Sequence, residues 1–342
     1  MANKLVTLGL QGGGSHGAFT WGVLDRLLED GRIDIQGISG ASAGSMNAVV
    51  LAHGFTVGGR DGARQSLKDF WEAVATNTPL AGIAENSTIP RGGEAADGSG
   101  PPALKAFLFM TRFFSPYQLN PFDINPLRDI LQRQVDFERL RADCRIKLFI
   151  AATRASTGTL RLFGTKELTL DALLASACLP ALHHSIEIDG EAYWDGGLTA
   201  NPPVLPLFHQ CTANDLILIL LQPAPSPQTP SSADEISHRL TEISFSSALS
   251  TELRGLVGAK QEAERGLFAF GRLDRRLRRF NFHLIDAQEF MSRLSTLSKA
   301  NTDAAFIGAL RDEGRQRADS WLVDNFRHLG ERSSCRVEHL LR

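Results

Sequence analysis

Short apolar segments typical of strands alternate along this chain with longer amphipathic segments typical of helices. Such alternation predicts an α/β fold, in which helices cover both faces of a mostly parallel sheet. The expected strands lie at about 4–10, 33–39, 145–153, 159–163, 186–194, 215–221 and 280–285. The expected helices include 17–30, 43–53, 61–76, 125–134, 169–178, 234–265 and 303–328. In open parallel sheets, ligand sites form at the edge where the strands end.

Composition narrows the class of partner. The chain has 342 residues, of which 43% are hydrophobic, enough for a sizeable core in one large domain or two ordinary ones. Its net charge of -2 argues against general binding of nucleic acid, which requires a basic surface. No nucleic-acid partner is therefore expected.

Cysteine spacing and hydropathy bear on the compartment. Four scattered cysteines match neither a disulfide framework nor a metal-ligand spacing: Cys144, Cys178, Cys211 and Cys335. A reducing compartment and no metal are expected. The apolar run after Lys4 is too short for a signal peptide, and no run approaches the roughly 20 residues of a membrane-spanning helix. We expect a cytoplasmic protein, with peripheral contact to a membrane left open.

Small residues crowd the end of the second expected strand. Residues 37–45 read Gly-Ile-Ser-Gly-Ala-Ser-Ala-Gly-Ser. Within them, Gly40 and Gly44 flank Ser42 in the pattern G-x-S-x-G of a nucleophile elbow, a strained strand-to-helix turn that lifts the serine oxygen above the sheet edge. A plain Gly/Ser turn is the alternative. The flanking strand and helix favour Ser42 as a nucleophile.

A second glycine cluster, Gly12-Gly13-Gly14-Ser15-His16-Gly17, follows the first expected strand. It fits the G-x-G-x-x-G fingerprint of dinucleotide binding, which requires an acid at the end of the next strand. That end carries no carboxylate, and Asp34 lies near the strand's start instead. The other interpretation is an oxyanion loop, whose amides stabilise the negative oxygen of an ester under attack. Neighbouring parallel strands would bring this loop beside Ser42.

Histidine is the usual base for a catalytic serine, but none is well placed here. His283 lies within the last expected strand, where its side chain alternates with apolar neighbours instead of standing at a strand end. His183 and His184 are adjacent, so a regular strand would point them to opposite faces. No metal-ligand spacing accompanies them.

Asp195 is the better candidate for the base. It precedes Gly196 and Gly197 and then Asn-Pro-Pro at 201–203, a composition that predicts a tight turn with the carboxylate at its rim. An ordinary Asp-Gly turn is the alternative.

Together these motifs resemble those of the patatin-like phospholipase family. The resemblance rests on the glycines at 12–14, on residues 40–44 followed by Asn47-Ala48, and on Asp-Gly-Gly at 195–197. Residues 125–128 resemble a segment found in bacterial members, and residues 176–180 resemble the family's approach to its Asp-Gly-Gly motif. The resemblance covers about residues 4–221 and, more weakly, residues 303–329. The resemblance implies a three-layer α/β/α sandwich, and hydrolysis by a Ser-Asp dyad without histidine or cofactor.

The resemblance also assigns roles to single residues. It implies that Ser42 is the nucleophile and Asp195 its base, which must lie within about 2.6 to 3.2 Å of the serine oxygen. The expected oxyanion donors are Gly12, Gly13, Gly14 and Ala43, supported by Gly40, Gly44, Gly196 and Gly197.

His16 is a departure, because family members usually carry Arg or Lys at this position. A histidine has a reference pKa of about 6.5 and is mostly neutral at pH 7. We therefore expect a weaker attraction for a phosphate head group, so that neutral or lysolipid esters compete with diacyl phospholipids.

Two regions lie outside this pattern. Residues 85–102, rich in Gly, Ser, Pro and Ala, predict a flexible loop, whereas 103–114 are apolar on nearly every side. The apolar stretch suits a cap over an apolar cleft, an interfacial helix or a buried core helix. The arginines of 272–279 suit a solvated helix face better than lipid contact.

The expected organisation is one acyl hydrolase domain over 1–342, with the loop and apolar cap at about 85–122 and a C-terminal helical extension at about 234–342. The expected function is hydrolysis of lipid acyl esters, phospholipid or lysophospholipid, through an acyl-serine intermediate. Two alternatives stay open. The same dyad could cleave other acyl esters or thioesters, or the chain could be a non-catalytic lipid-binding protein that keeps the fold.

Overall fold

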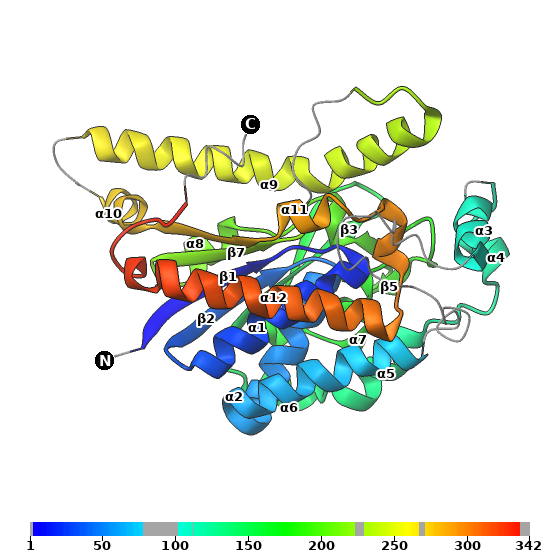
Figure 1. Ribbon diagram of the computed structural model, residues 1–342, viewed down its shortest axis with the longest axis horizontal. Helices are drawn as coiled ribbons and strands as arrows, with labels where there is room; N and C mark the ends of the chain where they lie inside the picture. The colour runs from blue at the N-terminus through cyan, green and yellow to red at the C-terminus, as the bar shows by residue number, and fades with distance from the viewer. Residues whose placement is uncertain (1–2, 78–101, 112, 223–228, 267–270, 336–342) are drawn as a thin grey trace.

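The computed structural model describes residues 3–77, 102–111, 113–222, 229–266 and 271–335 (Figure 1). Its centre is an eight-stranded sheet in the order β5-β6-β3-β2-β1-β7-β8, with β4 paired to β3 beside this path. The strands are β1 (Lys4–Leu10), β2 (Ile33–Gly40), β3 (Lys147–Arg154), β4 (Leu160–Gly164), β5 (Ile186–Ile188), β6 (Glu191–Asp195), β7 (Asp215–Leu220) and β8 (Asn281–Asp286). The pairs from β3 to β8 along this order are parallel, and β4, β5 and β6 pair antiparallel.

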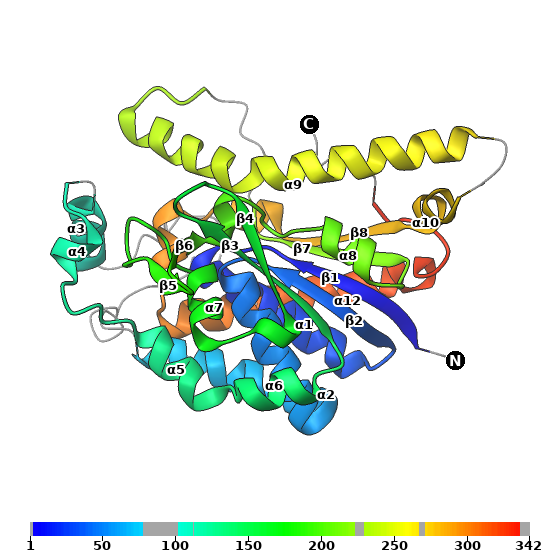
Figure 2. The same cartoon turned by 180° about the vertical axis from the view of Figure 1, so that it is seen from behind.

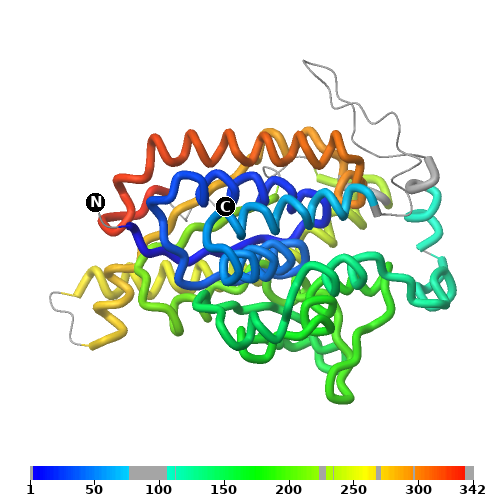
Figure 3. The backbone as a smooth tube through the Cα atoms, turned by 90° about the horizontal axis from the view of Figure 1, so that it is seen from below, coloured from blue at the N-terminus to red at the C-terminus, as the bar shows by residue number. Residues whose placement is uncertain are grey.

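Helices cover both faces of the sheet. They are α1 (Gly17–Asp30), α2 (Ala43–Asn77), α3 (Pro102–Met110), α4 (Pro116–Leu119), α5 (Pro126–Gln134), α6 (Phe137–Asp143), α7 (Leu170–Ser176), α8 (Leu205–Gln210), α9 (Ala233–Arg265), α10 (Arg272–Arg279), α11 (Gln288–Met291) and α12 (Ala304–Asn325). Figure 3 shows α12, α1 and α2 lying side by side on one face. Figure 2 shows α8, α9 and α10 on the other.

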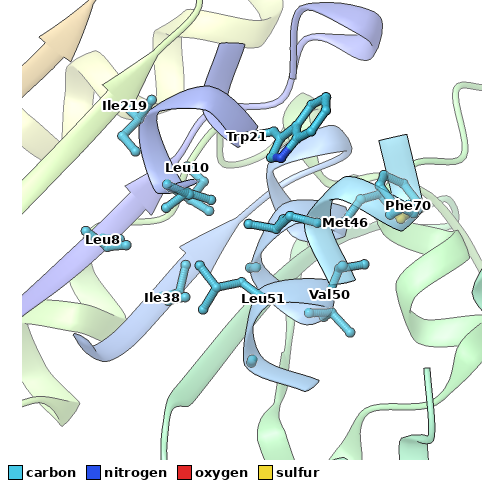
Figure 4. Close-up of a cluster of buried hydrophobic side chains, with 14 of the residues drawn as sticks. Leu8, Leu10, Trp21, Ile38, Met46, Val50, Leu51, Phe70 and Ile219 are labelled. Atoms are coloured by element: carbon cyan, nitrogen blue, oxygen red, sulfur yellow. The ribbon is translucent and has the colours of Figure 1, made fainter. Parts of the chain in front are cut away.

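Alternating strand residues supply two hydrophobic cores. On β7, Ile217 and Ile219 join the core under α1, α2 and α12, whereas Leu216, Leu218 and Leu220 join the core under α8, α9 and α10. A strand buried on both faces in this way is typical of a parallel sheet between helix layers. Figure 4 shows part of the first core, with Leu8, Leu10, Ile38 and Ile219 from the strands, Trp21 from α1 and Met46, Val50, Leu51 and Phe70 from α2. The expected three-layer α/β/α sandwich with a mostly parallel sheet is confirmed.

Two expected elements differ in detail. The single strand expected at 186–194 is a hairpin, β5–β6, because Asp189 and Gly190 both have positive φ and reverse the chain. The helices expected at 43–53 and 61–76 both lie in α2, which is kinked at Gly58 and Gly59. The flexible loop expected at 85–102 lies outside the described residues except for its last position.

Candidate active site

Ser42 stands in a strained turn between β2 and α2. Its φ is 53°, a left-handed conformation that non-glycine residues rarely adopt. The turn is tight, because a Cβ added to Gly44 would overlap the carbonyl oxygen of Leu10 at the end of β1. The amide of Ser42 donates to the carbonyl and the hydroxyl of Ser176 in α7, at 3.0 and 3.1 Å. These contacts leave the side chain of Ser42 half-buried at the carboxyl edge of the sheet.

The glycine loop lies directly beside Ser42. The register pairs Leu10 with Gly40, so the ends of β1 and β2 are level. A Cβ added to Gly12 would lie 2.8 Å from the Cβ of Ser42. The amide of Gly12, however, already donates to Oδ1 of Asn201 at 2.6 Å. Gly12 is thus held in place by a side chain that follows the Asp-Gly-Gly turn.

The other expected donors are differently placed. No hydrogen bond from the amides of Gly13, Gly14 or Ala43 to another segment is found within the described part of the chain. Ala43 and Gly14 are the first residues of α2 and of the 3-10 helix η1 (Gly14–His16), and the first amides of a helix have no acceptor within it. The amides of Ala43 and Gly14 therefore stay unpaired among the described residues, as does that of Gly13.

Asp195 ends β6, level with the nucleophile turn. β6 runs antiparallel to β3 and places Asp195 opposite Ala152, two residues beyond the pair formed by Gly40 and Ile150. The side chain has no exposed surface. Oδ1 accepts a hydrogen bond from the amide of Gly197 at 2.7 Å. Oδ2 is buried and has no hydrogen-bond partner among the described residues.

The electrostatics of this carboxyl group suit a base. Burial raises the pKa of Asp195 to about 7, and hydrogen bonding by the amide of Gly197 and the hydroxyl of Ser42 opposes part of that rise. The Ser42 hydroxyl thus lies close enough to the carboxyl group to lower its pKa slightly, although no hydrogen bond to Oδ2 meets normal limits among the described residues. The structure thus brings Ser42 and Asp195 together, with one carboxylate oxygen fixed by Gly197 and the other free.

His16 does not face the site. It is buried, and its Nε2 lies 2.7 Å from the hydroxyl of Ser298 in the 3-10 helix η5 (Thr296–Ala300). Burial, and secondarily the nearby charge of Lys299, lower the pKa of His16 to about 3. The ring of His16 is thus neutral at pH 7 and buried, and the expectation of a weaker attraction for a phosphate head group stays a prediction.

The backbone of Lys299 lies against the glycine loop. A Cβ added to Gly14 would overlap the carbonyl oxygen of Lys299, so the two backbones touch. Burial lowers the pKa of Lys299, and Glu242 on α9 opposes this shift. Nothing in the sequence indicated this contact, because some 280 residues separate Ser298 and Lys299 from the loop. Asn201 and Ser176, by contrast, lie within stretches that the motifs had singled out.

His283 and His184 both have other partners. Nε2 of His283 lies 3.0 Å from Oδ1 of Asp215, at the start of β7 and hence at the opposite edge of the sheet. The ring of His184 stacks on Tyr117 at 4.1 Å. Across the residues that the structure describes, no group of three His, Cys, Asp or Glu side chains could hold a metal ion. No helix in that part of the chain is long and apolar enough to cross a membrane.

Comparison with known proteins identifies a matching protein family. A family model described as patatin-like phospholipase matches residues 8–208. No curated protein sequence matches the chain. Among solved structures, VipD from Legionella pneumophila is similar at 14% identity and a TM-score of 0.40, with 100% of this chain and 73% of that chain covered. The ExoU–SpcU complex of the type III secretion system of Pseudomonas aeruginosa is similar at 16% identity and a TM-score of 0.31, with 94% and 60% covered.

Proposed function

The chain belongs to the patatin-like phospholipase family, whose model spans more than half of its sequence, and on this premise we propose that it is a serine hydrolase of lipid acyl esters that uses Ser42 and Asp195 as its dyad. One observation carries the proposal. The buried carboxyl group of Asp195 has one oxygen held by Gly197 and the other unpaired, beside a serine in a strained turn. Such an arrangement is suited to taking a proton from the serine hydroxyl.

Acylation begins when the carboxylate of Asp195 takes the hydroxyl proton of Ser42. The serine oxygen bonds to the carbonyl carbon of the ester, and the carbonyl oxygen becomes an oxyanion. The amides of Gly13, Gly14 and Ala43 donate to that oxyanion, and each such donor contributes about 3 kcal/mol to the barrier reduction. The ester bond then breaks, and the leaving alcohol takes the proton from Asp195.

Deacylation repeats the same steps with water. Asp195 takes a proton from water, whose oxygen bonds to the carbonyl carbon of the acyl-serine. The bond to Ser42 breaks, the serine oxygen regains the proton, and the fatty acid is released. No metal or organic cofactor takes part in this sequence.

The raised pKa of Asp195 matches this role. A general base works best when its pKa lies near the working pH. At about 7, the carboxyl group of Asp195 is ionised in a large fraction of molecules at neutral pH and still has enough affinity for a proton.

The test is hydrolysis of a lysophospholipid, a diacyl phospholipid and a short soluble ester by three variants. Ser42→Ala and Asp195→Asn should each lower kcat by about a thousandfold or more, because each removes one half of the proton transfer. The wild-type kcat/KM should rise as the pH passes about 7, where Asp195 ionises. The matched control is Asp189→Asn, an exposed acid at the tip of the β5–β6 hairpin that should leave the rates unchanged.

Labelling separates the enzyme from a non-catalytic lipid-binding protein. A fluorophosphonate should label the wild type at Ser42 and fail to label Ser42→Ala. Full activity in Ser42→Ala, or an unlabelled wild type, would refute the proposal. Hydrolysis of the short ester with neither phospholipid cleaved would assign the dyad to another class of acyl ester.

A further inference from the structure

An exposed apolar segment projects from the end of the molecule. Eight of the sixteen large apolar side chains that are exposed among the described residues fall between 107 and 124, and we call this segment the aromatic arm. They are Phe107, Phe109, Met110, Phe113, Phe114, Tyr117, Phe122 and Ile124. The rings of Phe109 and Phe113 contact each other, with centroids 5.3 Å apart. The interpretation of this stretch as a buried core helix is wrong for its described side chains.

The aromatic arm lies at the catalytic end of the sheet. Figures 1 and 2 show α3 and α4 standing beyond β5, at the end toward which β1 and β2 run. Tyr117 anchors the arm, because its ring stacks on His184 and its hydroxyl lies 3.1 Å from that of Ser185. These two residues directly precede the hairpin that ends at Asp195. The arm is therefore fixed to the segment that delivers the base.

A second apolar stripe lies on the first half of α9. Ile236, Leu240 and Ile243 follow one another at helical spacing and are 44%, 61% and 48% exposed. The same helix reaches the site, since the carbonyl of Phe245 accepts from Asn201 at 3.3 Å and its ring packs against Gly197. The α9 stripe and the aromatic arm thus flank the residues around Asp195.

Exposed apolar surface of this extent marks an interaction site, because leaving it in water is unfavourable. The sequence between 102 and 124 holds two cationic residues, Lys105 and Arg112, and one acidic residue, Asp123, a net charge of +1. Aromatic residues in a segment of net positive charge suit the boundary between anionic head groups and acyl chains. An ester carbonyl in a bilayer also reaches Ser42 only where the catalytic end meets the lipid.

We propose that the aromatic arm, assisted by the α9 stripe, docks this protein on an anionic membrane surface with its catalytic end toward the lipid. This inference rests on the proposed function for its orientation. The exposed side chains enter the outer part of the bilayer, and the net charge of +1 over residues 102–124 favours anionic head groups.

The test measures binding to vesicles in the Ser42→Ala background, so that no lipid is hydrolysed. The probes are phosphatidylcholine vesicles with and without phosphatidylglycerol, and binding is measured by co-sedimentation. Phe113→Ser with Phe122→Ser should weaken binding to the anionic vesicles by about tenfold or more. The matched control is Val323→Ser, which changes an apolar side chain that is 79% exposed on α12, and it should bind like the parent.

Two further measurements keep the outcomes separate. With Ser42 intact, the double variant should hydrolyse the short soluble ester at the wild-type rate and lose activity only on vesicles. Equal vesicle binding by parent and double variant, or no binding by the parent, would overturn the docking proposal. Self-association of the parent that the double variant abolishes would assign the arm to a protein contact and also overturn it. Failure of the wild type itself to hydrolyse the short soluble ester would instead refute the proposed function.

Discussion

The burial of Asp195 suits its proposed role as a base but lowers the stability of the fold. Its complete burial raises the pKa to about 7 from an ordinary value of 3.8. Between these two values the folded state binds more protons than the unfolded state, so the free energy of unfolding falls as the pH rises through this range. Above pH 7 the ionised carboxylate costs about 4 kcal/mol of stability. Keeping the proposed base buried therefore lowers the stability of the fold.

Asp195→Asn should therefore stabilise the protein at alkaline pH while it removes activity. The amide oxygen of asparagine can still accept from Gly197, and the desolvated charge is gone. We expect the free energy of unfolding to rise by about 2 to 4 kcal/mol at pH 8.5 and to change little near pH 4. Denaturant titrations at the two pH values measure this. Asp189→Asn should show no such pH-dependent difference, and equal stability of Asp195→Asn and wild type at pH 8.5 would contradict the burial argument.

The sequence predicted the turns of the site, because a tight turn requires small side chains. Small residues around Ser42 and after Asp195 are required by the turns themselves, so the motifs could be read directly. The occupied amide of Gly12 and the inward position of His16 could not be predicted, because both depend on partners, Asn201 and Ser298, that only the folded chain brings near. The catalytic roles themselves remain proposals.

Among the elements, α1 and α12 pack unusually closely. A Cβ added to Gly22 in α1 would overlap the carbonyl of Arg311, and one added to Gly314 in α12 would overlap the carbonyl of Phe19. Each helix therefore presents a glycine to the backbone of the other. This contact fixes the outer helix of the layer that covers β1.

Gly22→Ala should force these helices apart. We expect the free energy of unfolding to fall by about 2 to 3 kcal/mol, because a methyl group would have to displace backbone. Gly308→Ala on the same α12 is the control, since a Cβ there meets nothing within 4 Å. That control should be neutral or raise stability by about 0.5 to 1 kcal/mol through helix propensity. Equal effects of both changes in a urea titration would show that the contact is looser than described.

Periodicity predicted the buried elements well and the exposed ones poorly. The strands β1, β2 and β7 and the helix α1 follow the expected boundaries because burial on one or both faces imposes a regular pattern. The Asp189-Gly190 turn was hidden within a strand-like run, although Asp-Gly is itself a hairpin signal. The exposure of the aromatic arm could not be predicted, because an apolar sequence does not reveal whether a partner covers it.

Across the whole molecule, residues beyond the family match complete the fold. The match ends at residue 208, yet β7, β8 and α12 lie in or on the same sheet. Asp215 ties these parts together. It accepts from His283 at 3.0 Å, from Asn281 at 3.1 Å and from the amide of Gly330 at 3.0 Å. The sequence predicted a C-terminal extension but gave no indication of this network, whose members come from three separate segments.

The pKa of Asp215 makes this network testable. Burial alone would raise the pKa, but the hydrogen bonds from His283, Gly330 and Asn281 outweigh it and hold the pKa below its ordinary value of 3.8. The stabilisation is therefore present above pH 3.8 and is lost as the pH falls through the folded-state pKa. Asp215→Asn should lower the free energy of unfolding by about 2 to 4 kcal/mol at pH 7, with a smaller deficit near pH 3.

Activity provides the control for this prediction. Asp215 lies at the edge of the sheet opposite Ser42, so folded Asp215→Asn should cleave a short soluble ester at the wild-type rate. A deficit that does not shrink at low pH, or a loss of kcat without loss of stability, would contradict a purely structural role.

The ring of Phe245 lies over Gly197, whose amide holds the buried carboxyl group. That ring belongs to the same helix whose outer stripe of Ile236, Leu240 and Ile243 is exposed. An outward tilt of α9 would admit water to Asp195 and lower its pKa, so that the carboxylate would bind a proton less tightly. In the proposed mechanism, a partner that moves α9 would therefore also change how readily Asp195 activates Ser42.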